Sequence, residues 1–407
     1  MDTMLFGGIR MIKKIIFTFL LLFPFFVSAL ETNSKHAILY NLNEEKIVFE
    51  KNSNEITSIA SLTKIMTTIV AIENIEDLDA KVTITEKDFN GLYDASLAGF
   101  EVGDEVTYRD LLYGTMLPSG AEASQALANN ISGSVNGFAG LMNEKAKELG
   151  MKNTHFINTS GLDINNHYST VYDVALLLKY CLNNETFKTI FESASYKTSN
   201  GKLTLYSTFR YTAIKYNYKS DYILGAKTGY TDDAGKCLAS IAYDQSNDIL
   251  YLLVTTGANT STDDAYHIKD ATNIYTYYFE NYGYVNLVDK DELLVSIKTK
   301  YSKNKYLNFY AKEDVSFYTK KDEFDKNKIK IIYDGVNIID QSIKKGEKLG
   351  TVSIYYDDEY INNIDIILND EYKFSIIYFL LQNKKITIPV ILGICSLIYL
   401  IKRINKN

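Results

Sequence analysis

The sequence is poor in the residues that build metal centres and disulfide frameworks. It has three cysteines, which show no metal-ligand spacing, and one of them lies in a hydrophobic tail. The four histidines are scattered, without an HExxH or paired-ligand arrangement, which disfavours a zinc hydrolase. We therefore predict neither a metal nor a cofactor, and we expect the histidines to be structural. These residues are Cys181, Cys237, Cys395, His36, His155, His167 and His267.

Positive charge is also in short supply. The chain has 43 Lys and Arg against 50 Asp and Glu, a net charge of −7, so it lacks the basic surface that nucleic-acid binding requires. Tryptophan is absent and there are 3 prolines, and neither fact indicates a function. The remaining composition, 46% apolar and 23% charged, is that of a globular protein, and 407 residues suffice for two or three domains.

The N-terminal segment has the pattern of an export signal. Residues 11–29, MIKKIIFTFLLLFPFFVSA, contain two lysines near their start, continue as an apolar stretch and end in Val-Ser-Ala. This order is typical of a secretory signal peptide, which we assign to residues 1–29 with cleavage after Ala29. We therefore expect an exported protein.

A second apolar segment, Ile386–Ile401, lies near the C-terminus and is followed by Lys402, Arg403 and Lys406. Basic residues beyond an apolar segment are typical of the cytoplasmic side of a membrane. The segment is slightly shorter than the roughly 20 residues of a membrane span, so it either spans the bilayer or lies on its surface. We assign residues 374–407 to a membrane anchor with a basic cytoplasmic tail, which holds the protein to the outer face of the cell membrane.

The pattern between the two ends predicts an α+β catalytic domain at residues 30–285. Residues 36–52 alternate apolar and polar side chains around an Asn-Glu-Glu turn, and residues 223–256 alternate again, so both indicate strands. Strands at the front and back of one domain must pair to be buried, and we therefore expect an antiparallel sheet flanked by helices. The expected helices start at Ser61, lie on both sides of Pro118, and cover 138–151, 169–182 with Ser169 as its cap, and 263–283.

A different pattern follows at residues 286–373. Short alternating strands such as LLVSIKT, KIKIIYD and GTVSIYY are separated by turns containing Lys, Asp and Gly. We predict a small all-β, sandwich-like domain here.

The segment SIASLTKIMTT raises the question of a nucleophile with its base, because Ser61 precedes Lys64 by three residues. Apolar residues at helical spacing begin here, and positions i and i+3 share one face of a helix, so the two side chains should lie side by side. At a helix start the unsatisfied amides favour negative charge, and a desolvated lysine there can act as a neutral base. From this segment alone, a solvated helix start with a chance Ser and Lys is an equally good interpretation. The same Ser-x-x-Lys pattern recurs at Ser199/Lys202, Ser302/Lys305 and Ser342/Lys345.

Two further motifs carry polar chemistry. Lys227-Thr228-Gly229 lies in an alternating strand, where a glycine permits close approach and a lysine beside a hydroxyl suits a carboxylate. Taken alone, this motif is better interpreted as a surface lysine next to a turn. Ser119-Gly120 puts a hydroxyl on a tight loop between two helices. The joint order of helix Ser-x-x-Lys, loop Ser-Gly and strand Lys-Thr-Gly is far more specific than any one motif.

This order, with ASLTKIMTT, VTYRDLLYGTMLPSGAEAS, NTHFINTSGLD, HYSTVYDVALL and GAKTGYTDDAGKCLAS, resembles the serine-type D-alanyl-D-alanine carboxypeptidases, the low-molecular-weight penicillin-binding proteins. The resemblance covers roughly residues 36–283, and 343–361 is similar to the C-terminal β domain of that family. It implies the fold shared by β-lactamases and DD-peptidases. It also implies a peptidoglycan stem peptide ending in D-Ala-D-Ala as substrate and β-lactams as covalent inhibitors.

The resemblance also implies residue roles. Ser61 would be the acylated nucleophile, Lys64 its proton acceptor and Ser119 a proton relay toward the leaving amine. The Lys227-Thr228-Gly229-Tyr230 stretch would bind substrate, with Lys227 and Thr228 on its terminal carboxylate. The backbone amides of Ser61 and Tyr230 would form the oxyanion hole.

One position departs from the family pattern, because the loop motif is usually Ser-x-Asn and its third residue here is Ala121. Loss of that amide would cost on the order of 10²-fold in rate. The nearby Glu122 is expected to cap the following helix. Two alternatives to the carboxypeptidase therefore stay open: a β-lactamase, for which the region of Asp163 offers no glutamate, and a catalytically weakened wall-binding scaffold.

Overall fold

The computed structural model describes residues 30–261 and 264–404, so the signal segment predicted at residues 1–29 lies outside the described residues. The chain divides after Tyr277 into two compact units. The domain bounds expected from the sequence stay predictions.

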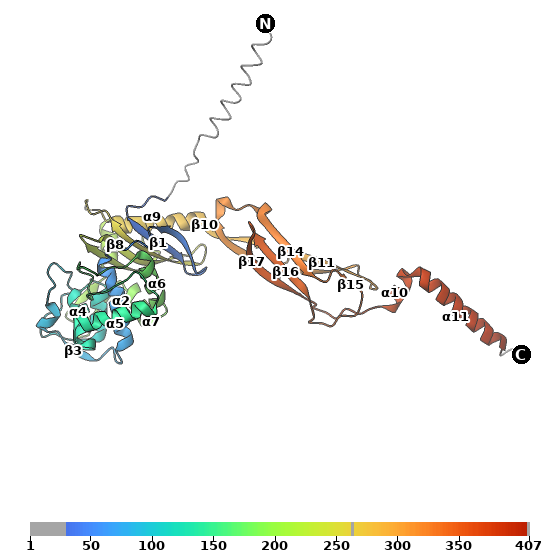
Figure 1. The fold of residues 1–407 in the computed structure, drawn as a ribbon, viewed down its shortest axis with the longest axis horizontal. Helices are drawn as coiled ribbons and strands as arrows, with labels where there is room; N and C mark the ends of the chain where they lie inside the picture. Colours follow the sequence, from blue (N-terminus) through green and yellow to red (C-terminus); the bar gives the residue numbers. More distant parts are fainter. Residues whose placement is uncertain (1–29, 262–263, 405–407) are drawn as a thin grey trace, which may run out of the picture. The chain divides into compact units, whose positions relative to one another are not determined.

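The first unit is built on a five-stranded antiparallel sheet in the order β2-β1-β9-β8-β7 (Figure 1). The N-terminal hairpin joins the later strands because β1 pairs with β9, placing His36 opposite Thr256. This pairing of sequence-distant strands confirms the predicted antiparallel sheet. Its strands are β1 (His36–Asn41), β2 (Lys46–Lys51), β7 (Ile223–Thr231), β8 (Gly235–Asp244) and β9 (Ile249–Ala258).

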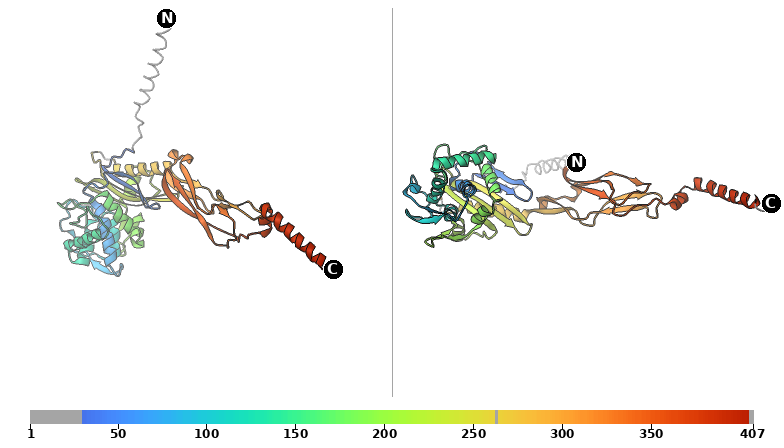
Figure 2. Two further views of the ribbon diagram at one scale, coloured as in Figure 1. Left: turned by 45° about the vertical axis from the view of Figure 1, so that its right-hand side comes forward. Right: turned by 90° about the horizontal axis from the view of Figure 1, so that it is seen from below.

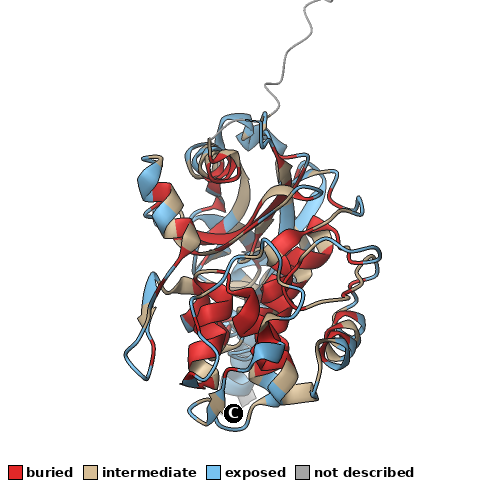
Figure 3. Ribbon diagram, turned by 90° about the vertical axis from the view of Figure 1, so that its left-hand side faces the viewer, coloured by how far each residue is buried: buried red, intermediate tan, exposed pale blue. Residues whose placement is uncertain are grey.

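The central strands of this sheet are buried on both faces. On one face, Ala239 and Ile241 of β8 join the hydrophobic core formed with the helices. On the other face, the Ser240 hydroxyl and carbonyl of the same strand both hydrogen-bond the Tyr275 hydroxyl of α9 (Tyr266–Asn281). Figure 3 shows the buried segments of the sheet and of the helices lying together. The strands therefore read as nearly continuous apolar runs rather than as strict alternation.

Local signals explain where the helices begin and end. Thr107 caps α3 (Tyr108–Met116) by accepting from the Asp110 amide, and the Asp110 carboxylate accepts from the Thr107 amide in return. The chain then turns through Pro118 and Ser119 into α4 (Ala121–Ser132). The other helices and 3₁₀ turns of residues 30–265 are η1 (Ala60–Leu62), α2 (Thr63–Asn74), η2 (Glu86–Phe89), α5 (Val135–Glu148), α6 (Val171–Cys181), α7 (Glu185–Glu192) and α8 (Thr208–Lys215).

Some local expectations were wrong or incomplete. The cap of α6 is Thr170, whose hydroxyl accepts from the Asp173 amide, and not Ser169, whose hydroxyl bonds Thr154 instead. Residues 185–215 gave no clear helical pattern in the sequence, although they contain α7 and α8. Two short strand pairs complete this unit: β3 (Lys81–Thr83) with β4 (Glu105–Thr107), and β5 (Ser195–Lys197) with β6 (Thr204–Tyr206).

The second unit is mainly β, as predicted (Figure 2). It has its own hydrophobic core, which includes Val288, Ile297, Val352 and Ile354. Its strand pairs are antiparallel except for β11 with β15. The strands are β10 (Tyr282–Val288), β11 (Leu293–Thr299), β12 (Tyr306–Tyr310), β13 (Val315–Lys320), β14 (Ile329–Gly335), β15 (Ile338–Ile339), β16 (Lys348–Tyr356) and β17 (Glu359–Ile367), with 3₁₀ turns η3 (Lys321–Glu323) and η4 (Lys326–Lys328).

Two helices follow the β strands along the chain, α10 (Ile376–Gln382) and α11 (Lys384–Ile404). Residues Lys384–Arg403 of α11 are long and apolar enough to cross a membrane, and none of the apolar window is buried. The helix is longer than the apolar segment expected from the sequence because its first turn carries Lys384 and Lys385 and its last turn carries Lys402 and Arg403. Twenty helical residues extend about 30 Å, the thickness of a bilayer core.

A close backbone contact holds the loop after Asn158 against the turn before α2. Gly161 has φ +84°, and a Cβ atom there would lie 1.8 Å from the carbonyl oxygen of Ala60. The Asn158 side chain shapes this loop by accepting from the Ser160 and Gly161 amides at 3.1 and 2.7 Å. Only glycine permits both the backbone conformation and the contact.

We expect Gly161→Ala to lower the free energy of unfolding by at least about 2 kcal/mol, because left-handed strain and a backbone collision act together. Gly133→Ala is the matched control, since Gly133 also has a left-handed φ, +77°, but has nothing within 4 Å of a Cβ. The control should lose about 1 kcal/mol from strain alone. Denaturant unfolding of the two variants measures the difference, and equal losses would contradict the contact.

Candidate active site

The predicted nucleophile and base lie side by side. Ser61 occupies the 3₁₀ turn η1, and Lys64 lies in the first turn of α2. The Lys64 Nζ is 3.0 Å from the Ser61 Oγ, and it also donates to the Ser160 carbonyl oxygen at 2.7 Å. The residue before the serine, Ala60, has a left-handed φ of +45°, so the turn that presents the hydroxyl is itself strained.

Burial changes the protonation of this lysine. Lys64 is 2% exposed, and desolvation lowers the pKa of its ammonium to about 7, while the carboxyl group of Glu122 opposes the shift. A pKa near 7 means that the neutral amine is abundant at neutral pH. A neutral amine in contact with a serine hydroxyl is the arrangement that a general base requires.

Ser119 lies in the same cavity but is not bonded to either lysine. It is 5% exposed, adopts a φ of +65°, and its Oγ has no hydrogen-bond partner among the described residues. The following residue must be small, because a Cβ on Gly120 would come within 2.6 Å of Ala98 and 2.8 Å of the Gly114 carbonyl oxygen. A buried hydroxyl without a partner is unusual in folded proteins and is available to a ligand or a water.

The Lys-Thr-Gly motif lies on β7, as expected, but its three residues face different surroundings. Lys227 is fully buried, and its Nζ donates to the Thr228 carbonyl oxygen at 3.0 Å. Burial, together with the charge of Lys64, sets the pKa of Lys227 well below its usual value. Gly229 lies close to the nucleophile turn, since a Cβ there would be 3.1 Å from the Ser61 amide nitrogen.

Most of the predicted site residues line one cavity of about 280 Å³. Lys227 is not among the described residues that line it. Those that do line it are Ser61, Lys64, Ser119, Thr228, Gly229 and Tyr230. The cavity also includes Thr208, Ser160 and Lys236, which the sequence analysis did not identify.

The side chain of Glu122 supports a loop instead of capping its helix, which corrects the expectation above. Glu122 is fully buried, and its Oε1 accepts from the amides of Ala98 and Gly99 at 2.6 and 2.9 Å. Burial raises the pKa of this carboxyl group, and the amide bonds partly offset that effect. The carboxyl thus holds the loop that borders the cavity, opposite α2.

His167 fixes the loop on the other side of Lys64. Its Nδ1 accepts from the Ile157 amide at 3.1 Å, so its Nε2 carries the proton and donates to the Thr63 Oγ1 at 2.9 Å. Burial lowers the pKa of His167 to about 4, which keeps the ring neutral at pH 7. Among residues 30–261 and 264–404, no group of three or more His, Cys, Asp or Glu side chains could hold a metal ion.

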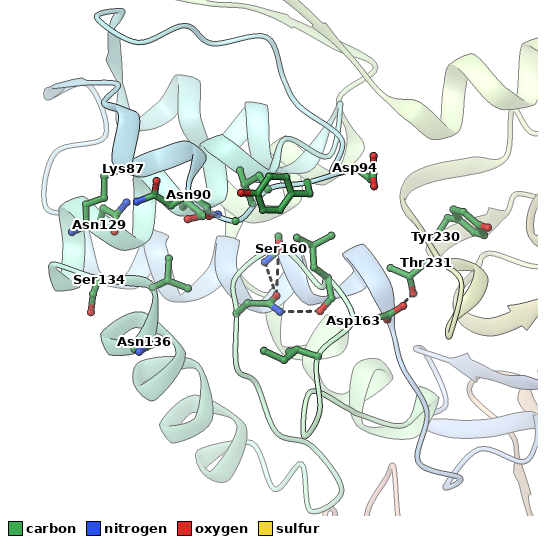
Figure 4. A pocket seen from close by; sticks show the side chains of 18 of the residues that line it. Lys87, Asn90, Asp94, Asn129, Ser134, Asn136, Ser160, Asp163, Tyr230 and Thr231 are labelled. Carbon is green, nitrogen blue, oxygen red and sulfur yellow. Dashed lines mark hydrogen bonds between the residues drawn. The ribbon is translucent and has the colours of Figure 1, made fainter.

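A second cavity of about 830 Å³ adjoins the first and shares Ser160 and Tyr230 with it (Figure 4). In Figure 4, Lys87 and Asn129 lie at one end, and Thr231 and Asp163 at the other. The Thr231 hydroxyl donates to the Asp163 carboxylate at 2.9 Å, so this acid is bonded to the β7–β8 turn. The side-chain amides of the lining belong to Asn90, Gln125, Asn129, Asn136 and Asn158.

Two family models match the chain. The D-alanyl-D-alanine carboxypeptidase model of peptidase family S11 matches residues 24–260. The C-terminal domain of penicillin-binding protein 5 matches residues 282–373.

Individual proteins give the same result. D-alanyl-D-alanine carboxypeptidase DacF of Bacillus subtilis is 32% identical over 353 residues, which cover 85% of this chain and 87% of DacF. DacC of Escherichia coli is 28% identical, with 84% and 85% covered. Penicillin-binding protein 5 of Haemophilus influenzae, at 23% identity, supports the fold, with a TM-score of 0.60 over 84% of this chain and 98% of that one. The DD-transpeptidase of Streptomyces K15 matches with a TM-score of 0.55 at 30% identity, covering 61% and 98%.

The carboxypeptidase model matches more than half of the chain, and the likeness to DacF extends over most of both proteins. This chain therefore belongs to the D-alanyl-D-alanine carboxypeptidase family and is a serine-type carboxypeptidase of the penicillin-binding protein group.

Proposed function

We propose that this enzyme removes the terminal D-alanine from peptidoglycan stem pentapeptides through an acyl-enzyme on Ser61, and that penicillin inhibits it by acylating the same hydroxyl. The observation that carries the proposal is the 3.0 Å contact between the Ser61 Oγ and a buried lysine whose pKa is about 7. The family assignment supports the substrate class.

In the proposed acylation, the neutral Lys64 accepts the Ser61 proton while the Oγ attacks the carbonyl carbon of the scissile peptide bond. The negative charge that develops on the carbonyl oxygen is stabilised by the backbone amides of Ser61 and Tyr230. The absence of a side chain at Gly229 keeps β7 close to the Ser61 amide, which is 3.1 Å from where a Cβ would lie. Ser119 passes the proton from Lys64 to the nitrogen of the departing D-alanine.

Deacylation reverses these roles. A water molecule takes the place of the leaving amine, gives a proton toward Lys64, and attacks the ester carbonyl. The shortened stem peptide leaves and Ser61 regains its proton. The same cavity serves both steps, so one base suffices.

The terminal carboxylate is expected, from the sequence, on Lys227 and Thr228. We assign the direct contact to the Thr228 hydroxyl, because Thr228 lines the cavity whereas Lys227 is fully buried. The Thr228 Oγ1 is 2.6 Å from the Thr208 Oγ1, which fixes its direction. Lys227 instead donates a hydrogen bond to the Thr228 carbonyl oxygen of its own strand.

The second, amide-rich cavity is proposed to receive the part of the stem peptide that precedes D-Ala-D-Ala (Figure 4). Side-chain amides both donate and accept hydrogen bonds, as the backbone of a bound peptide requires. An exported enzyme anchored through α11, with Lys402 and Arg403 on the cytoplasmic side, would meet this substrate at the outer face of the membrane.

Ser61→Ala is expected to abolish covalent labelling by benzylpenicillin, because it removes the hydroxyl that lies 3.0 Å from the Lys64 amine. Intact-protein mass spectrometry followed by peptide mapping measures the adduct. Ser302→Ala is the matched control, since Ser302 also precedes a lysine by three residues but belongs to the second unit. Labelling that survives Ser61→Ala would refute the assignment.

Glu122→Gln is expected to shift the acidic limb of the acylation rate to lower pH. The Glu122 carboxylate raises the pKa of Lys64, so its loss lowers that pKa below about 7 and keeps the amine neutral in more acidic solution. The glutamine oxygen can still accept from the Ala98 and Gly99 amides. The pH dependence of penicillin acylation measures the shift, with Glu148→Gln as control. A midpoint that stays or rises would contradict the coupling.

Ala121→Asn is expected to increase D-alanine release by up to roughly 10²-fold, because it restores the amide of the usual Ser-x-Asn motif. Ala121 is 1% exposed and lines the cavity at the start of α4. Ala95→Asn, which adds an amide to the same cavity elsewhere, should change the rate by less than about threefold. Binding without D-alanine release in both the wild type and Ala121→Asn would instead favour a wall-binding scaffold.

A further inference from the structure

The cavity that holds Ser61 and Lys64 also contains a lysine that has no role in the proposed mechanism. Lys236 of β8 lines it, opposite Tyr230 in the β7–β8 ladder. The Lys236 Nζ donates to the Asp264 carbonyl oxygen at 2.5 Å, which orients the ammonium. An ammonium has three N–H donors, so it can hold a backbone carbonyl and a ligand carboxylate together.

Strand alternation separates this lysine from Lys227. In the β7–β8 ladder Lys227 is opposite Ala239, which belongs to the core shared with the helices. Thr228 and Tyr230 alternate with Lys227, so they lie on the other face, where Tyr230 is paired with Lys236. The side chains of Lys227 and Lys236 therefore lie on opposite faces of the sheet. Of the two, only Lys236 is partly exposed and lines the cavity.

Physical chemistry disfavours Lys227 as the partner of an anion. Its complete burial, and the charge of Lys64, set its pKa well below the usual value, so a full positive charge there is costly. The product D-alanine carries a carboxylate at pH 7. A carboxylate entering a confined cavity needs a cation or several donors to compensate its lost hydration.

Other polar side chains line the cavity beside Lys236. His267, in the first turn of α9, lines the same cavity, is 8% exposed, and its Nδ1 has no hydrogen-bond partner among the described residues. Burial and the charge of Lys236 lower the pKa of His267 to about 4, so the ring is neutral and carries one N–H. A buried polar nitrogen without a partner is destabilising unless a ligand or a water molecule bonds to it. The Thr208 and Thr228 hydroxyls, 2.6 Å apart, complete this end of the cavity.

We propose that Lys236 is the specificity residue for the terminal carboxylate of the substrate, with the Thr228 hydroxyl and His267 beside it. This inference rests on the proposed function and refines it. It makes Lys236 the reason that the enzyme cleaves only at a free C-terminus. An acyl donor whose terminal carboxylate is masked as an amide loses the charged contact and binds weakly.

The test compares two peptides, one ending in D-Ala-D-Ala and one ending in D-Ala-D-Ala amide, on the full chain and three variants. Lys236→Met keeps the length of the side chain and removes its charge, and Lys236→Arg keeps the charge. Lys269→Met is the matched control, because Lys269 is a partly exposed lysine of the neighbouring helix that does not line the cavity.

We expect Lys236→Met to lower kcat/KM for the free-acid peptide by roughly 10- to 100-fold, mainly through KM, the loss typical of one charged hydrogen bond. The amide peptide should change by less than about threefold, so the preference for the free acid disappears. Lys236→Arg should restore most of that preference, and Lys269→Met should leave it unchanged.

Equal losses on both peptides would show a structural role and overturn the proposal, as would an unchanged preference in Lys236→Met. Failure of the proposed function looks different, because the wild type itself would then neither release D-alanine nor be labelled by penicillin at Ser61. Normal labelling of the wild type with an unchanged preference in Lys236→Met overturns the Lys236 assignment alone.

Discussion

The chemistry of this site depends on the removal of one ammonium group from water. Lys64 is 2% exposed in the first turn of a helix, where the helix dipole also disfavours a positive charge. Its Nζ keeps two polar contacts, the Ser61 hydroxyl and the Ser160 carbonyl oxygen, at 3.0 and 2.7 Å. These contacts satisfy the group without adding a negative charge next to it. Glu122 opposes the shift of its pKa only in part, so that pKa falls to about 7, as the proposed role of Lys64 as a base requires.

Two loops help to exclude water from Lys64, and each loop is held by contacts between distant parts of the chain. The loop around Gly161 lies against the Ala60 carbonyl, and His167 bonds it to Thr63 at the start of α2. In the other loop, the carboxylate of Glu122 accepts hydrogen bonds from the backbone amides of residues 98–100. The burial that tunes the lysine is therefore a property of the whole unit and not of the Ser-x-x-Lys segment.

This origin explains what the sequence could and could not predict. Helical spacing predicted that Ser61 and Lys64 lie together, because that contact depends only on local geometry. The order of strands and helices predicted the sheet, because front and back strands have no other partner. Thr208 and Ser160 gave no such signal, since they reach the cavity from an unassigned helix and an irregular loop. The complete burial of Lys227 could not be predicted from its motif either, because it depends on the contacts of β7 with distant parts of the unit.

The proposed reaction places two opposite electrostatic demands on the cavity. A general base at neutral pH needs an amine that gives up its proton, whereas recognition of a carboxylate needs a cation that keeps its own. Two lysines in the same environment could not do both, because burial acts on each in the same direction. The alternation of the edge strand β7 resolves this conflict. It places Lys227 on the face of the sheet that packs against the helices, and Thr228 on the opposite face with the partly exposed Lys236. Lys227 can then be fully buried on one face of the sheet, while Lys236 stays partly exposed on the other.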